Sequence, residues 1–243
     1  MSNAYRDDLA YIHDTGYGDI ARGAAAVLLA ALRQRGVISG LVIDLGCGSG
    51  ILAAEVSAAG YDVLGFDISR AMIALARKRA PKARFREQSL WTANLPACVA
   101  VTAVGECFNY LFDRANTDLT LRKLFYHVYD ALTPGGLFLF DVAEPGRVPG
   151  SGVQRHYREG DGWAVLVAVE EDRAHSRLTR RITSFRKSGK HYRRQHEVHQ
   201  QRLLKGSELA GQLRDICFRV RLLRGYGRLR FPPGYVGLLA AKQ

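Results

Sequence analysis

The chain has 243 residues, which is enough to bury one substantial hydrophobic core and to carry an insertion. A composition of 47% hydrophobic and 24% charged residues is that of a folded globular protein and argues against intrinsic disorder. The formal net charge is +12, and the excess lies wholly after residue 150, because residues 1–150 contain 15 basic and 15 acidic side chains.

Nothing in the sequence indicates export or a membrane span. No uninterrupted apolar run approaches the roughly 20 residues that a bilayer requires. The first eight residues lack the basic start and apolar stretch of a signal peptide. The four cysteines, at positions 47, 98, 107 and 217, form neither a Cys-x-x-Cys pair nor a zinc-ligand spacing. We therefore expect a cytoplasmic protein with reduced thiols, no membrane contact and no metal site.

Segments with helical and strand patterns alternate along the first 145 residues. Apolar side chains three and four positions apart predict helices, and short apolar runs predict buried strands. The expected helices cover residues 18–35, 51–59, 69–79 and 117–132, and the expected strands cover residues 40–45, 61–67, 84–87, 99–104 and 137–142. Ser69 is placed to cap the third helix, and Thr133–Gly136 is expected as a turn. This alternation predicts a doubly wound α/β fold with a mostly parallel sheet.

The pattern changes after Pro145. Polar, alternating stretches at residues 163–170, 177–185 and 191–202 predict an antiparallel meander of three or four strands, with a hairpin turn at Ser188–Gly189. A helix over 207–217, capped by Ser207, follows it. Two further strands, at 218–223 and 235–241, are expected to form a hairpin that rejoins the main sheet, with residues 225–234 as the connecting loop. These two strands bring the main sheet to seven.

Four parts of the chain follow from these elements. We expect an N-terminal helical lid segment over residues 1–36 and a Rossmann-like core over residues 37–145. The antiparallel insertion would cover residues 146–204, and the C-terminal helix and hairpin over residues 205–243 would complete the core sheet.

A glycine-rich loop, Asp44-Leu45-Gly46-Cys47-Gly48-Ser49-Gly50, follows the first expected strand. Such a loop lies at the carboxyl edge of a parallel sheet, where ligands bind, and its glycines let the backbone approach a ligand closely. The spacing differs from a dinucleotide fingerprint, because Ile51 stands where that pattern requires Gly or Ala, and no Lys-Ser/Thr follows as in a P-loop. Asp44 is placed to attract an ammonium group, and Asp67, at the end of the second strand, is placed to accept two ribose hydroxyls.

These residues resemble a known family. Val42–Gly50, together with Gly65-Phe66-Asp67-Ile68-Ser69, looks like the first two motifs of the class I S-adenosylmethionine-dependent methyltransferases. Leu132–Gly136 is similar to the turn that these enzymes carry before a later strand. The resemblance covers roughly residues 37–145. More loosely, the meander resembles the strand insertion in small-molecule methyltransferases of the sugar N-methyltransferase type.

The resemblance implies S-adenosylmethionine as cofactor and gives roles to particular residues. Asp44 and the loop backbone would face the methionine part, Asp67 would bind the ribose, and Ile68 would pack on the adenine. Many family members carry an acid after the third strand to meet the adenine amine, whereas this chain has Ser89 there, so the backbone is the alternative partner for that amine. The full set of expected cofactor-binding residues is Asp44, Leu45, Gly46, Cys47, Gly48, Ser49, Gly50, Asp67, Ile68, Ser69, Ser89, Leu90 and Gly105.

Fewer residues are candidates for the acceptor side. Glu106, after the fourth strand, is a candidate to hold an amine or take a proton, or else a helix-cap carboxylate. Tyr11 and His13 are catalytic candidates because their segment is placed to fold over the cofactor. Asn109 and Tyr110 are candidates for substrate binding. Surface or packing roles are the alternative for all five.

Three functions stay open from the sequence. The first is methyl transfer, by direct displacement, to a nitrogen or oxygen atom of a small molecule, with the meander shaping the acceptor pocket or a homodimer contact. The second is methylation of RNA or another polyanion, suggested by the basic C-terminal third but lacking aromatic residues interleaved with the arginines. The third is a non-catalytic cofactor-binding protein. A general base is required only if the acceptor arrives protonated.

Overall fold

The computed structural model describes residues 5–150 and 152–243, and it contains a seven-stranded main sheet. The strand order is β10-β13-β5-β4-β1-β2-β3, in which β13 alone runs antiparallel to its neighbours. The strands are β1 (Leu41–Leu45), β2 (Asp62–Asp67), β3 (Arg84–Glu87), β4 (Cys98–Ala103), β5 (Leu132–Ala143), β10 (Phe218–Leu223) and β13 (Tyr235–Lys242). The predicted doubly wound fold, the seven strands and the rejoining C-terminal hairpin are confirmed.

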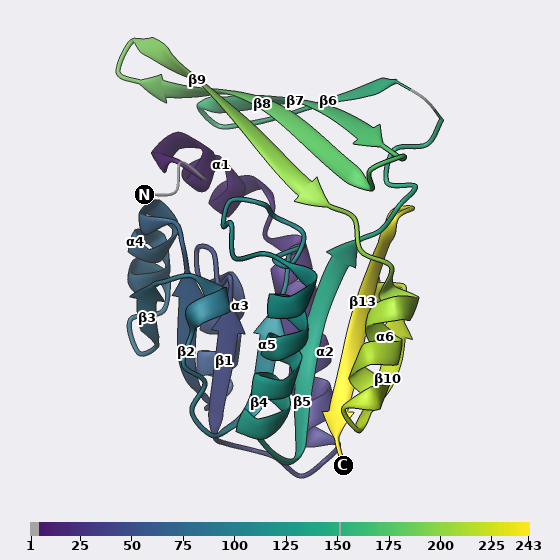
Figure 1. Cartoon of the computed structure of the whole chain (residues 1–243). Helices are drawn as coiled ribbons and strands as arrows, with labels where there is room; N and C mark the ends of the chain where they lie inside the picture. The colour runs from purple at the N-terminus through teal and green to yellow at the C-terminus, as the bar shows by residue number, and fades with distance from the viewer. Residues whose placement is uncertain (1–4, 151) are drawn as a thin grey trace.

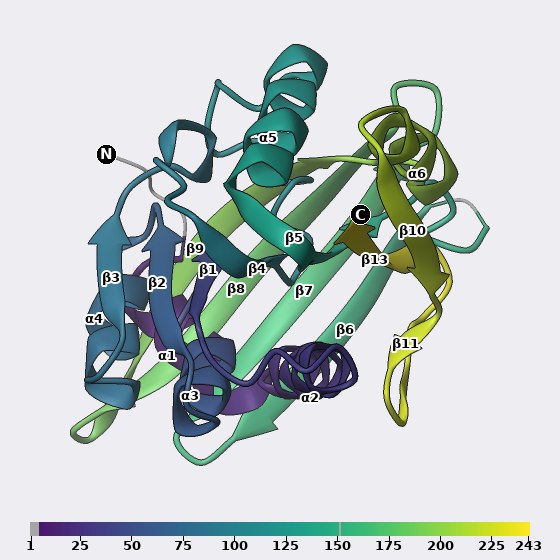
Figure 2. The ribbon, with the colours of Figure 1, turned by 90° about the horizontal axis from the view of Figure 1, so that it is seen from below.

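Helices cover both faces of this sheet, as Figure 2 shows from below. One face packs against α5 (Asp118–Ala131) and α6 (Gly206–Asp215) through a cluster that includes Phe125 and Phe138. The other face packs against α2 (Asp19–Arg33), α3 (Ile51–Ala58) and α4 (Arg70–Arg79) through a second cluster around Leu28 and Val56. Strand residues alternate between the two clusters, as Val42 and Ile43 do, because successive side chains point to opposite faces. Both sides of the inner parallel strands, such as β1 and β4, are therefore buried, as their apolar sequences predicted, whereas the edge strand β3 buries only Phe85.

Short-range signals fix several element ends. The Ser69 hydroxyl accepts from the Met72 amide and caps α4 as predicted. The predicted cap of α6 by Ser207 is wrong, because the helix begins at Gly206, whose amide donates to Glu144 instead. The turn Thr133–Gly136 is not separate from the next strand, since β5 begins at Leu132 and the turn residues bulge out between Leu132 and Leu137, which both pair with β4.

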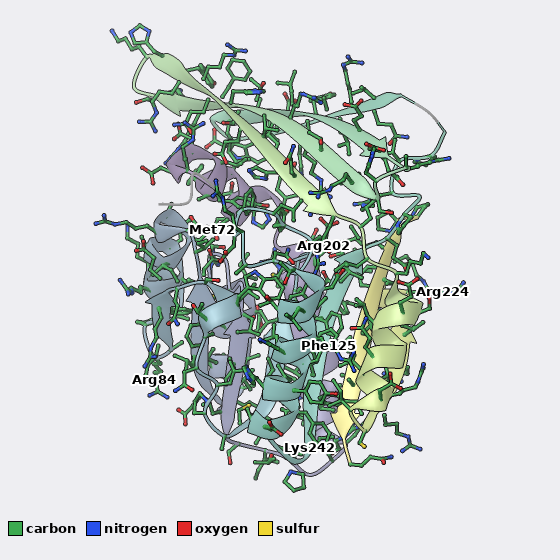
Figure 3. All side chains as sticks on the ribbon, viewed as in Figure 1. Met72, Arg84, Phe125, Arg202, Arg224 and Lys242 are labelled. Carbon is green, nitrogen blue, oxygen red and sulfur yellow. The ribbon has the colours of Figure 1, made fainter. Side chains whose placement is uncertain are left out.

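A second, four-stranded antiparallel sheet follows the core and will be called the insertion sheet. Its strands are β6 (Val153–Gly160), β7 (Trp163–Asp172), β8 (Arg177–Ser188) and β9 (His191–Arg202). The predicted meander is confirmed, with β6 as a strand that the sequence did not single out. In Figure 1 the insertion sheet lies over the carboxyl ends of the main strands. Arg202, labelled in Figure 3 near the end of β9, reaches α5 and pairs with Asp118.

The expected N-terminal segment contains a helix that the apolar spacing had not predicted, α1 (Asp7–Gly16), ahead of α2. Figure 1 shows α1 beneath the insertion sheet. Leu9 and Ile12 of α1 share a small separate core with Trp163, Val165 and Ile182 of that sheet. Packing therefore joins α1 to the insertion sheet, although some 150 residues separate them in the chain.

Three further observations complete the description. The expected loop over residues 225–234 contains a short hairpin of β11 (Gly225–Tyr226) and β12 (Leu229–Arg230). Across the part of the chain that the structure describes, no helix has the length and apolarity needed to cross a membrane. The outer face of the insertion sheet exposes Tyr157, Leu166 and Val198, and the homodimer contact expected there stays a prediction.

Candidate functional site

A cavity lies at the carboxyl ends of the parallel strands, with the segment around α1 as its opposite wall. Its empty space, including the part open to solvent, is about 1070 Å³, which suits a ligand of small-molecule size. The residues that line it are Tyr5, His13, Tyr17, Ala21, Asp44, Gly46, Cys47, Gly48, Ser49, Ile51, Leu52, Phe66, Asp67, Ile68, Ser69, Met72, Ser89, Leu90, Trp91, Val104, Gly105, Cys107, Tyr110, Phe112 and Asp113. Met72, labelled below α1 in Figure 3, is one of these lining residues.

The glycine loop (residues 44–50) forms the floor with bare backbone. Gly46 and Gly48 have φ values of +71° and +52°, which residues with a side chain rarely adopt. A Cβ at Gly46 would lie 2.5 Å from the sulfur of Cys107, while one at Gly48 would meet nothing within 4 Å. Because Gly48 lines the cavity, a side chain there would occupy space that is left for a ligand.

Asp44 carries a buried oxygen that the protein does not satisfy. Its Oδ1 accepts a hydrogen bond from the Thr102 hydroxyl at 2.7 Å, but its Oδ2 is buried with no partner among the described residues. Burial raises the pKa of Asp44 to about 7; the Thr102 hydrogen bond opposes this rise and the charge of Asp67 adds to it. A buried acceptor without a donor is unfavourable, so a cationic ligand group at this position would stabilise the carboxylate.

Asp67 lies at the end of the neighbouring parallel strand, and its carboxylate is held in place by backbone. Oδ2 accepts from the Gly48 amide at 2.9 Å and Oδ1 accepts from the Ser69 amide at 2.8 Å. Burial raises the pKa of Asp67, and these backbone hydrogen bonds oppose the rise. Each oxygen keeps a further lone pair for a ligand hydroxyl. The structure thus brings Asp44 and Asp67 to one cavity from adjacent strands.

Aromatic rings form the opposite wall, which we call the aromatic wall: Tyr5, His13, Tyr17, Tyr110 and Phe112. The His13 and Tyr17 rings stack with centroids 5.7 Å apart, and those of Tyr110 and Phe112 stack at 4.8 Å. Tyr5 meets His13 edge-on at 5.2 Å. Ring faces attract cations, so the cavity combines carboxylates on the floor with an aromatic wall above them.

His13 is neutral in this environment. Burial lowers the pKa of its imidazole to about 4, with the charge of Asp14 opposing the shift. Its Nδ1 is buried without a hydrogen-bond partner among the described residues. At neutral pH the ring therefore offers an unprotonated nitrogen as a hydrogen-bond acceptor.

Most of the predicted cofactor residues line the cavity. Ile68, Ser69 and Gly105 do so at the ends of β2 and β4. Ser89 and Leu90 do so at the start of a short 3₁₀ helix, where the Ser89 hydroxyl caps the turn by accepting from the Trp91 amide at 3.1 Å. Two exceptions are Leu45, which lies in the hydrophobic core, and Gly50, which packs against Ala76 of α4.

Three of the predicted acceptor-side residues lie outside the cavity, which corrects their expected placement. The Tyr11 ring is covered by the Arg186 guanidinium, 3.9 Å from its centroid. Asn109 is fully buried and bonds the backbone of Ala143 and Arg202, so its amide joins the core to the end of β9.

Glu106, the third, is engaged by the insertion sheet. Both of its oxygens accept from the Arg180 guanidinium, at 2.7 and 3.1 Å, and Oε2 also accepts from the Gln201 amide at 2.7 Å. Burial alone would raise its pKa, but the charges of Arg180 and Arg147 and the hydrogen bonds from Arg180 and Gln201 together hold the pKa of Glu106 below its ordinary value. Its carboxylate is an anchor between the two sheets and does not line the cavity.

The sequence did not identify several lining residues, among them Tyr5, Trp91, Phe112 and Asp113. Tyr5 and Phe112 belong to segments without a motif, and only the fold brings them together. A feature of the whole set is also new: the residues found to line the cavity include three carboxylates and neither Lys nor Arg. The basic excess of the chain therefore lies elsewhere.

Comparison with known proteins gives a consistent result. Residues 42–136 match a family model described as a methyltransferase domain. A curated protein of Geobacillus sp. strain WCH70, named provisionally as a methyltransferase, is 30% identical over 106 residues. That alignment covers 42% of this chain and 41% of the relative, so less than half of the relative's length is matched.

Solved structures match over nearly the whole chain. An S-adenosylmethionine-dependent methyltransferase of Clostridium acetobutylicum is 19% identical with a TM-score of 0.79, covering 96% of this chain and 97% of the other. CalS10, an amino pentose methyltransferase of Micromonospora echinaspora solved with S-adenosylmethionine bound, is 19% identical with a TM-score of 0.77 and covers 100% of both chains. At these identities the match shows that the fold is shared, insertion sheet included.

Proposed function

We propose that the chain, which carries a methyltransferase domain over residues 42–136 and shares its fold with an S-adenosylmethionine-dependent methyltransferase, is a class I enzyme of that kind and transfers a methyl group to a nitrogen or oxygen atom of a small molecule. One observation carries the proposal. Asp44 and Asp67 reach a single cavity from adjacent strand ends, one with an unsatisfied buried oxygen and the other held ready by backbone.

The residues present fit S-adenosylmethionine. Its ammonium group would satisfy Oδ2 of Asp44, and its ribose hydroxyls would donate to the remaining lone pairs of Asp67. Gly46 and Gly48 leave room for the methionine part against bare backbone. Ile68 and Leu90 supply apolar surface for the adenine, and the absence of an acid at Ser89 leaves the adenine amine to backbone or solvent.

When bound, S-adenosylmethionine supplies a methyl carbon on a positively charged sulfur, which is already activated for displacement. The protein then has to align the acceptor atom with that carbon and to exclude water. The aromatic wall closes the cavity above the floor and favours positive charge through its ring faces. His13, held neutral, can accept a hydrogen bond from the molecule that receives the methyl group. This contact orients the lone pair of the atom that is to be methylated.

A small-molecule acceptor fits this cavity better than a polyanion. The lining contains carboxylates and aromatic rings and, as described, no Lys or Arg that would meet a phosphate. CalS10, whose fold this chain shares over its full length, is named as an amino pentose methyltransferase, which supports a small molecule bearing an amine as the acceptor. The cytoplasmic location expected from the sequence is part of this proposal.

The test is turnover with a panel of small amines and alcohols. Wild-type protein is incubated with S-adenosylmethionine and each acceptor, and S-adenosylhomocysteine is detected by a coupled hydrolysis assay. We expect product with at least one amine and calorimetric binding of S-adenosylmethionine but not of NAD. Binding of S-adenosylmethionine without turnover on any acceptor would favour the non-catalytic alternative, and tight NAD binding would contradict the assignment.

A further inference from the structure

Two tyrosine hydroxyls meet on the aromatic wall. The Tyr5 and Tyr110 oxygens are 3.0 Å apart, and both residues line the cavity. They come from distant parts of the chain, since Tyr5 precedes α1 and Tyr110 lies in the connection between β4 and α5. The pair carries two hydroxyl hydrogens, and the hydrogen bond between the two oxygens uses one of them.

The second hydrogen has no acceptor among the described residues. The third group at the pair is Arg180, whose Nη1 lies 3.3 Å from the Tyr110 oxygen. A guanidinium can only donate, so Arg180 cannot take a hydrogen from either tyrosine. Both side chains are part-buried and line the cavity, so the pair is a hydrogen-bond donor whose remaining hydrogen is available to a molecule in the cavity.

Arg180 is itself fixed from the core. Its bidentate contact with Glu106 is nearly buried, the two side chains being 16% and 6% exposed. The Glu106 backbone amide in turn donates to Asp141 at 2.7 Å, which ties this residue to the end of β5. Burial works against its charged form, but the charge of Glu106 raises the pKa of Arg180 above its ordinary value, so the donor stays charged. Arg180 thus holds the Tyr110 oxygen from a rigid support.

We propose that the Tyr5–Tyr110 pair donates a hydrogen bond to an oxygen atom of the methyl acceptor, a hydroxyl or ether oxygen near the methylated atom, and that Arg180 is the positioning residue for this donor. The inference rests on the proposed function and deepens it. It assigns the insertion sheet a part in acceptor choice, because Arg180 belongs to β8. The acceptor class is then an oxygen-bearing small molecule.

Two probes that differ in one hydroxyl test the inference: trans-2-aminocyclohexanol and cyclohexylamine. We expect wild type to prefer the amino alcohol about tenfold in kcat/KM, the value of one neutral hydrogen bond in a buried site. The double variant Tyr5→Phe/Tyr110→Phe should lose this preference, so that the ratio of its kcat/KM values for the two probes falls to about one, because only the amino alcohol uses the lost donor. Arg180→Lys should reduce the preference in part. If these residues acted only in folding, their substitution would lower kcat/KM equally for both probes.

Matched controls separate the site from general effects. Tyr126→Phe removes a hydroxyl from an exposed tyrosine of α5, and Arg181→Lys changes the next residue of β8, which pairs with an exposed Glu170. Both should keep the tenfold preference. An unchanged preference in the double variant, or equal loss on both probes, would overturn the inference. Weakened S-adenosylmethionine binding would overturn it too, by making the cofactor the hydrogen-bond partner. If wild type binds S-adenosylmethionine but neither binds nor methylates the amino alcohol, the inference alone is contradicted. If wild type does not bind S-adenosylmethionine, the proposed function is contradicted.

Discussion

The floor and the wall of the cavity are built in different ways. The floor comes from the glycine loop, residues 44–50, with Asp67 beside it, and much of what it offers is backbone: bare glycines and amides that hold Asp67. The wall comes from residues as far apart as Tyr5 and Phe112, and residues further on, Arg180 and Glu197, hold it through side chains. A site made of local backbone survives wide changes in sequence elsewhere, whereas a site made of distant side chains changes with each of its supports. This difference suits an enzyme whose floor binds a cofactor common to many enzymes and whose wall meets a methyl acceptor that differs between them.

The largest effect is expected where the floor needs bare backbone. Gly46→Ala places a Cβ 2.5 Å from the Cys107 sulfur at a φ of +71°, so the loop has to shift. We expect affinity for S-adenosylmethionine to fall about 100-fold, measured by calorimetry, and stability to fall by about 2 kcal/mol. Gly211→Ala is the matched control, since a Cβ there meets nothing within 4 Å and its helical backbone accepts alanine. Equal affinities for the two variants would show that the loop tolerates side chains.

Asp44→Asn should separate binding from stability. We expect affinity for S-adenosylmethionine to fall about 10- to 100-fold, as for a lost charged hydrogen bond. Because the folded pKa of Asp44 is about 7, above its ordinary 3.8, the folded state keeps a proton that the unfolded state releases, and the stability contribution is lost as pH rises from about 4 to 7.

The ligand-free Asp44→Asn variant should therefore melt roughly 10 °C above wild type at pH 8 and show no gain near pH 4, by thermal denaturation across pH. A melting difference that does not vary with pH would show that Asp44 is ionised throughout in the folded protein.

Substitutions in the residues that hold the aromatic wall should lower methyl transfer and have little effect on the binding of S-adenosylmethionine by the floor. Asp8 of α1 is 1% exposed and accepts from Arg186 and Arg193 of the insertion sheet at distances of 2.5–3.1 Å. Asp8→Asn should lower kcat/KM for methyl transfer about tenfold by loosening α1, while the Kd for S-adenosylmethionine changes less than threefold. Asp19→Asn, which breaks an exposed pair with Arg22, should change neither value. A large loss of cofactor affinity in Asp8→Asn would mean that floor and wall are one unit.

The smallest effect is expected at the junction of the two. The Ser69 hydroxyl caps α4 and also donates to the Tyr5 carbonyl at 3.0 Å. Ser69→Ala should cost about 1 kcal/mol of stability and weaken S-adenosylmethionine binding a few-fold. Thr117→Ala removes an equivalent cap from α5, at a residue outside the cavity lining, and should cost similar stability without changing affinity. Identical affinities of the two variants for S-adenosylmethionine would show that Ser69 acts only as a helix cap.

The same contrast explains what the sequence could and could not predict. The sheet, most helix positions and the residues of the floor followed from apolar periodicity, the glycine spacing and Asp67, because all of these are local. The helix α1 was missed as a separate element because Leu9 and Ile12 pack on strands more than 150 residues away. Glu106 was expected near the acceptor from its position after β4, and only the fold reveals that Arg180 engages it.

The most direct test of the account is calorimetric titration of S-adenosylmethionine into Asp67→Ala and into Asp62→Ala. Both variants lose a carboxylate from β2, but Asp62 lies exposed at the opposite end of the strand. The account predicts at least a 30-fold weaker Kd for Asp67→Ala, from about 2 kcal/mol or more of lost hydrogen bonding, and an unchanged Kd for Asp62→Ala, with both proteins folded by circular dichroism. Equal affinities in the two folded variants would contradict it.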